Sequence, residues 1–98
     1  RGPMAERPAP LIYVSIASYR DRELQWTIRN LFEQASDPDR VRVGVCWQFI
    51  PGEDDEHFSS PTRPEQVTVR AYDARASKGA GWARAIAHGL RDEEAPFG

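Results

Sequence analysis

The sequence predicts an α/β domain built on a parallel three-stranded sheet. Two observations predict it: three short apolar segments have strand character, and two stretches with helical spacing alternate with them. The order along the chain is strand, helix, strand, long loop, strand, helix. Because parallel strands need right-handed crossovers, we expect the sheet order 3-2-1, with the later strands of a doubly wound sheet missing. The first strand would then have one open side.

The first strand is expected within the segment LIYVSIASYRD, residues 11–21. Its apolar residues do not alternate cleanly with polar ones, which predicts a strand covered on both faces. Its polar end leads into a helix, and ligands of open α/β sheets bind at such strand ends. That end carries Ser15, Ser18, Tyr19 and Arg20. The alternative is an ordinary loop in which Asp21 caps the following helix.

The remaining elements follow from hydrophobic periodicity. A helix with Glu23 in its first turn is stopped by the Asp37-Pro38 pair, and a strand runs from Val41 to Gln48. A third strand, Val67 to Tyr72, is expected near a sheet edge, and a last helix from about Ala80 to Arg91. The apolar stripes expected to face the core are Leu24, Ile28, Leu31, Phe32 and Ala35 on the first helix, and Ala83, Ile86, Ala87 and Leu90 on the last.

The segment from Ile50 to Glu65 reads as a long loop, because it holds three prolines and has no regular period. Its acidic cluster, Glu53 to Glu56 with His57 beside it, contains oxygen ligands that hard cations prefer. We expect a solvated acidic loop here in preference to a metal site.

Length and composition limit the function classes. The 98 residues support one domain, residues 11–98, behind an extended tail, residues 1–10, whose first three residues read as a cloning remnant. A net charge of −2 argues against a duplex-binding protein, although six cations face two acids between Arg63 and Arg91. Single-stranded nucleic acid is therefore an unlikely partner, kept as an alternative. Because Cys46 is the single cysteine and no segment could span a bilayer, we expect no membrane association and a cytoplasmic location.

A second candidate segment is SKGAGWAR, Ser77 to Arg84, between the third strand and the last helix. Gly79 and Gly81 permit tight backbone geometry, and Lys78 and Arg84 offer charge for phosphate or ribose oxygens. Ordinary loop glycines are the alternative interpretation. Trp26, Trp47 and Trp82 are expected to pack against other residues in preference to binding a sugar, with Trp82 beside the glycines as the exception to consider. Cys46 is expected to be buried and His88 to lie on the surface.

The phrases IYVSIASYRD, RVRVGVCWQ and SKGAGWAR, in this order, resemble the UDP-GlcNAc-dependent polypeptide N-acetylglucosaminyltransferases that modify hydroxyproline, and their bacterial relatives. The resemblance spans about residues 11–90. More distantly, Ser77, Gly79, Ala83 and Arg84 resemble the Asn-x-Gly-x-x-x-Ala-Arg-Asn pattern of inverting glycosyltransferases with the GT-A fold, although Ser77 and Ala85 replace its two asparagines.

The resemblance implies a Rossmann-like partial GT-A domain, the N-terminal nucleotide-binding half of a glycosyltransferase. It implies two groups of site residues around UDP-GlcNAc. The uridine side would hold Ser15, Ala17, Ser18, Tyr19 and Arg20, and the other side Lys78, Gly79 and Arg84. The catalytic residues stay unassigned.

The resemblance also implies an Asp-x-Asp or related acidic motif at the end of a fourth strand, which would hold a divalent cation, Mn²⁺ or Mg²⁺, against the diphosphate. We expect that motif to follow Gly98, so it is missing from this sequence. We therefore expect no metal bound by this chain alone and little or no transfer of GlcNAc to a polypeptide or other hydroxyl acceptor. The alternative is a non-catalytic interaction module. Its open apolar strand edge would pair with a partner strand or form a homodimer.

Overall fold

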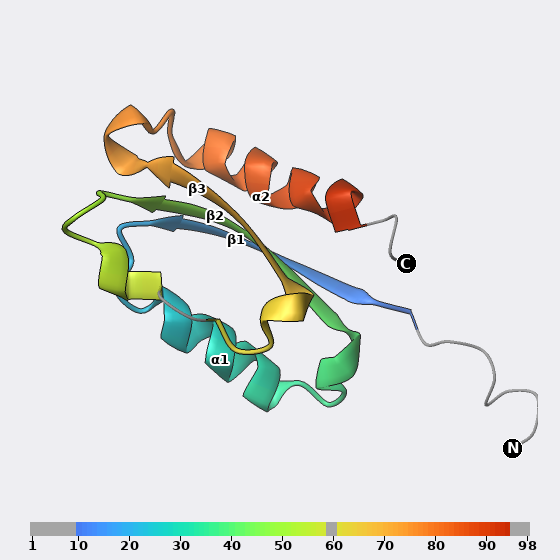
Figure 1. The fold of residues 1–98 in the computed structure, drawn as a ribbon. Coiled ribbons are helices and arrows are strands. Elements are labelled where there is room, and N and C mark those ends of the chain that lie inside the picture. The colour runs from blue at the N-terminus through green and yellow to red at the C-terminus, as the bar shows by residue number, and fades with distance from the viewer. Residues whose placement is uncertain (1–9, 59–60, 95–98) are drawn as a thin grey trace, which may run out of the picture.

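The computed structural model describes residues 10–58 and 61–94, so the tail at residues 1–9 lies outside the described residues. A parallel sheet lies between two helices, one on each face (Figure 1). The strands are β1 (Ile12–Tyr19), β2 (Val41–Phe49) and β3 (Val67–Asp73), and the helices are α1 (Leu24–Gln34) and α2 (Ala80–Glu94). These elements confirm the predicted α/β class and its order of elements.

The central strand is β2, with β1 and β3 on its two sides. Both pairings are parallel, with Ile12 opposite Val41 and Val43 opposite Val67. This is the predicted 3-2-1 order, and β3 is an edge strand as expected. All three strands therefore end at the same edge of the sheet, which we call the carboxyl edge.

The core between α1 and the sheet is aliphatic. Leu24 and Ile28 of α1 are fully buried against Val43 and Val45 of β2. Residues of β1 and β3, among them Val14 and Val69, pack around this cluster. Side chains return to the same face every 3.6 residues in a helix and every 2 residues in a strand, so these residues lie on facing surfaces. The apolar stripe predicted for α1 therefore forms this core.

The core between α2 and the sheet is smaller and uses short side chains. Ala83 and Ala87 of α2 are buried against Cys46 of β2, which confirms the buried cysteine. α2 also lies close to Gly44 of β2. A Cβ at this position would overlap the Tyr13 hydroxyl and lie 2.9 Å from the Ala87 carbonyl oxygen. Small residues therefore let α2 lie near the backbone of β2.

The prediction that β1 is covered on both faces is wrong. Ile12 is 48% exposed and Tyr19 57% exposed, and Ser18 is the one residue of the strand that is buried. The reason is topological: β1 pairs with β2 on one side, and no other described strand lies on its other side. An apolar composition alone does not distinguish a central strand from an edge strand.

Two smaller differences concern α1. The helix begins at Leu24, so Glu23 is its N-cap and does not lie in the first turn, while the Asp21 carboxylate accepts the Glu23 N–H at 2.8 Å. Trp26 is 60% exposed, so the expectation that it is a packing residue is wrong. Its ring lies 5.4 Å from the Arg29 guanidinium, an arrangement available on a helix surface.

Candidate functional site

The candidate site lies at the carboxyl edge of the sheet, on the side covered by α2. The strands end there at Tyr19, Phe49 and Asp73, and α2 begins at the same edge after β3 (Figure 1). A helix N-terminus carries free N–H groups and a positive dipole end. This edge therefore combines strand ends with a helix end suited to an anionic group.

The tip of β1 divides its side chains between the two faces of the sheet. Tyr13 faces α2, because its hydroxyl donates to the Ala87 carbonyl oxygen at 3.4 Å. Side chains alternate along a strand, so Ser15, Ala17 and Tyr19 also lie on the α2 side, where all three are exposed. Ser18 points to the α1 side and is buried, and its hydroxyl has no partner among the described residues.

The segment before α2 is a tight turn. Gly79 has φ 104°, a conformation that favours glycine, and its N–H donates to the Ser77 hydroxyl at 3.2 Å. Lys78 between them is exposed. Gly81 lies in the first turn of α2 with open space around its Cα, so the fold itself does not require a glycine there.

Arg84 lies on the flank of α2 that is nearer to β1. The opposite flank carries Trp82, whose ring meets Tyr72 of β3 edge-on at a centroid distance of 5.0 Å. Residues two positions apart on a helix project from nearly opposite sides, so Arg84 projects toward the β1 side of the sheet. The Arg84 side chain is exposed. The predicted residues brought to one side of the carboxyl edge are therefore Ala17, Tyr19, Lys78, Gly79 and Arg84, with Ser15 farther along β1.

Arg20 lies elsewhere, in an ion pair with Asp54. Its Nε donates to Asp54 Oδ2 at 2.7 Å and its Nη2 to Asp54 Oδ1 at 3.1 Å, and Nη2 also reaches Glu53 Oε1 at 3.3 Å. These hydrogen bonds from Arg20, with one from the Ile50 N–H, lower the pKa of Asp54 to about 2. The same hydrogen bonds raise the pKa of Arg20. The guanidinium charge is thus already balanced by carboxylates.

The expectation of a solvated acidic loop agrees with the exposed Glu53, Asp55 and Glu56 but is wrong at Asp54, which is 3% exposed. Its Oδ2 also accepts the Ile50 N–H at 2.9 Å, so the carboxylate organises the turn after β2. Nearby His57 lies 4.0 Å from Asp54 Oδ1 through Nε2. Asp54 is committed to an arginine, and no group of three metal-ligating side chains occurs among the described residues.

One residue of this edge was missed by the sequence analysis. Gln48, at the end of β2 on the α2 side, is 3% exposed, and its Nε2 donates to the Ser18 carbonyl oxygen at 3.0 Å. Its Oε1 is buried and has no partner among the described residues. A buried acceptor without a donor is uncommon in proteins. The sequence does show a polar residue at the end of a predicted strand. It cannot show that the Gln48 oxygen lacks a partner, because that depends on how the surrounding segments pack.

The expected basic surface between Arg63 and Arg91 is partly neutralised. Arg63 donates to Asp39 at 2.7 Å, and Arg75 to Asp73 at 2.6 Å. This pairing leaves a weaker positive field than the sequence count indicates, which lowers the support for nucleic-acid binding. His88 is exposed, as expected.

Neither helix in the described part of the chain is long and apolar enough to cross a lipid bilayer.

Neither a curated protein nor a solved structure matches the chain. A family model described as glycosyltransferase (GlcNAc) matches residues 11–64, more than half of the chain, which covers β1, α1, β2 and the loop that holds Asp54. The segment Ser77 to Arg84 lies beyond the matched range. This chain belongs to the GlcNAc glycosyltransferase family.

Proposed function

We propose that this chain is the nucleotide-binding part of a UDP-GlcNAc-dependent glycosyltransferase of the GT-A type. One observation carries the proposal: the tip of β1 and the start of α2, far apart in the sequence, lie on the same side of the carboxyl edge (Figure 1). The first of these segments falls within the family match and the second outside it. Their convergence supports a shared ligand between them.

The chemistry of this edge suits a nucleoside diphosphate that contains uracil. The diphosphate would lie at the N-terminus of α2, where Lys78 and Arg84 supply positive charge. The ring would lie near Tyr19, whose side chain is exposed at the tip of β1. Ser15 and Ala17 would border the ribose from β1.

The complete enzyme would transfer GlcNAc to a hydroxyl acceptor, with hydroxyproline in a polypeptide as our proposed example. A departing UDP needs a cation to balance its charge, and no group of three metal-ligating side chains occurs among the described residues. We therefore expect negligible transfer by this chain alone. The single cysteine, Cys46, is free and buried, which agrees with a proposed cytoplasmic location.

Calorimetric titration with UDP tests the nucleotide site. Loss of a charge-assisted contact in Arg84→Ala is expected to weaken UDP binding by roughly 10- to 100-fold. Arg91→Ala is the matched control, because Arg91 is an exposed arginine on the same flank of α2, seven residues farther from the carboxyl edge. Equal affinities of the two variants, or no binding of UDP by the unmodified chain, would contradict the proposal.

Addition of Mn²⁺ or of a chelator should leave the UDP affinity of this chain unchanged.

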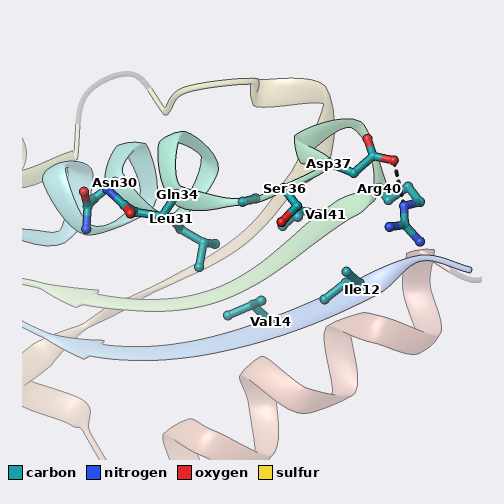
Figure 2. A pocket seen from close by; sticks show the side chains of 10 residues that line it. Ile12, Val14, Asn30, Leu31, Gln34, Ser36, Asp37, Arg40 and Val41 are labelled. Atoms are coloured by element: carbon teal, nitrogen blue, oxygen red, sulfur yellow. Dashed lines mark hydrogen bonds and ion pairs between the residues drawn. The ribbon is translucent and has the colours of Figure 1, made fainter.

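A second candidate function, an interaction module that forms a homodimer, is favoured by the open side of β1. Between Leu11 and Tyr19 the edge carries no charge, proline or glycine, the features that usually prevent strand pairing. Beside it lies a mainly apolar groove of about 540 Å³, where Ile12 and Val14 face Leu31 of α1 (Figure 2). A second copy pairing along residues 11–19 would bring no charged side chains of this strand together.

A further inference from the structure

The contacts of Arg20 and Asp54 join two turns at the carboxyl edge. Arg20 follows β1 directly and has φ 48°, a left-handed conformation that is unfavourable for a residue with a side chain. Asp54 belongs to the loop after β2. The surrounding structure must therefore stabilise the conformation of Arg20.

Two sets of bonds provide this stabilisation. The Arg20 N–H donates to the Gln48 carbonyl oxygen at 2.8 Å, and its guanidinium makes two parallel hydrogen bonds with Asp54. Asp54 is itself fixed, because its N–H donates to the Ile50 carbonyl oxygen and its carboxylate accepts the Ile50 N–H, both at 2.9 Å. A planar two-point contact restricts direction as well as distance. The turn after β1 is thus fixed to the end of β2.

We propose that Asp54 is a positioning residue of the nucleotide site: it holds Arg20, and with it the turn that orients Tyr19, and Arg20 does not itself bind the diphosphate. This inference rests on the proposed function. It differs from the sequence-based expectation, in which Arg20 lines the ligand directly. Tyr19 precedes Arg20 in the chain and is 57% exposed, so the conformation of this turn sets the direction in which its ring projects.

Arg20 could either position the turn or bind the diphosphate directly, and the effects of single and double substitutions on UDP binding distinguish these two roles. If the ion pair positions the turn, Arg20→Gln and Asp54→Asn each remove the same restraint, and UDP binding must then order the turn. The free-energy cost of ordering the backbone of one residue should weaken UDP binding by about 5- to 30-fold in each variant. The double variant should be no weaker than either single variant. If Arg20 instead bound the diphosphate, Arg20→Gln would weaken binding while Asp54→Asn would leave it unchanged or strengthen it.

Two further variants separate positioning from charge. Arg20→Lys keeps the charge but cannot make the two-point contact, so it should bind UDP as weakly as Arg20→Gln. Asp55→Asn is the matched control, since Asp55 is an exposed carboxylate of the same loop that accepts the Gly52 N–H at 3.0 Å. It should keep the affinity of the unmodified chain. Full affinity in Arg20→Lys would overturn the inference.

Amide exchange gives a measurement that is independent of UDP. In Asp54→Asn, the Arg20 amide should exchange several-fold faster, while amides at the centre of β2 keep their protection. Because Arg20 is 41% exposed in its side chain, Arg20→Gln serves the same purpose if Asp54→Asn does not fold. If the unmodified chain binds no UDP, the proposed function fails. Unchanged Arg20 exchange would overturn the ion pair's positioning role in either case.

Discussion

At the scale of single residues, Gly44 shows how one missing side chain allows two elements to approach. It lies on β2 beneath α2, in contact with Tyr13 from β1 and Ala87 from α2. Gly44 does not have a positive φ, so its backbone conformation is open to other residues and its role is steric. The glycine is therefore needed for space, and its conformational freedom is not used.

We predict that Gly44→Ala destabilises the fold. The added methyl group must displace the Tyr13 hydroxyl and the α2 backbone, and overpacking of this kind costs about 1–3 kcal/mol. Gly89→Ala is the control: its new Cβ would meet open space on α2, where alanine favours a helix by about 1 kcal/mol. Urea unfolding measures both. A stability of Gly44→Ala equal to that of the unmodified chain would contradict the predicted close packing.

At the scale of elements, the loop after β2 is organised by Asp54. Its carboxylate lies in contact with Arg20 and accepts a backbone N–H, although acidic clusters in loops are typically solvated. Folding therefore lowers the pKa of Asp54 to about 2, below the roughly 3.9 of an unfolded chain. A lowered pKa means that this carboxylate stabilises the fold when it is ionised.

This shift predicts a defined acid sensitivity. The contribution of Asp54 is fully present above about pH 4, the unfolded pKa, and is lost as the pH falls through about 2, the folded pKa. Unfolding free energies measured between these pH values should fall less steeply in Asp54→Asn than in the unmodified chain. In Asp54→Asn the unfolding free energy should still depend on pH, because hydrogen bonds from Arg75 also lower the pKa of Asp73 to about 2. An identical slope in Asp54→Asn would refute the assignment.

At the scale of the whole molecule, β1 and β3 are the edge strands of the described sheet, and β1 is the one without charged residues. Ile12 is 48% exposed there and lines the groove beside α1 (Figure 2). An apolar, uncharged edge strand is a template for pairing with another chain. The two candidate functions differ in whether this edge is used by a second copy.

We predict concentration-dependent dimerisation that Ile12→Lys abolishes, because a charge on an edge strand opposes pairing. Sedimentation velocity over a wide range of protein concentrations measures the association. Trp26→Lys is the matched control, since it removes an exposed apolar side chain from α1 and leaves the edge intact. A monomer at every concentration, or a dimer lost in Trp26→Lys alone, would exclude pairing through β1.

The sequence determined the elements and the faces that they bury. Leu24 and Ile28, and Val43 and Val45, repeat with the periods of a helix and a strand, and this local pattern predicts burial without any knowledge of partners. The alternation of elements likewise predicts the strand order. The two candidate ligand-binding segments could also be found from residue types alone.

Only the tertiary structure decided which polar groups meet. Arg20 and Asp54 are 34 positions apart, and nothing periodic in the sequence couples them. The same holds for the orphaned oxygen of Gln48, whereas the open side of β1 was already predicted from the order of the elements. Hydrophobic burial follows a repeating local pattern, whereas a specific polar contact depends on where separate segments of the chain come together. That difference is why the tip of β1 was predicted as a site, while the direction of its side chains was not.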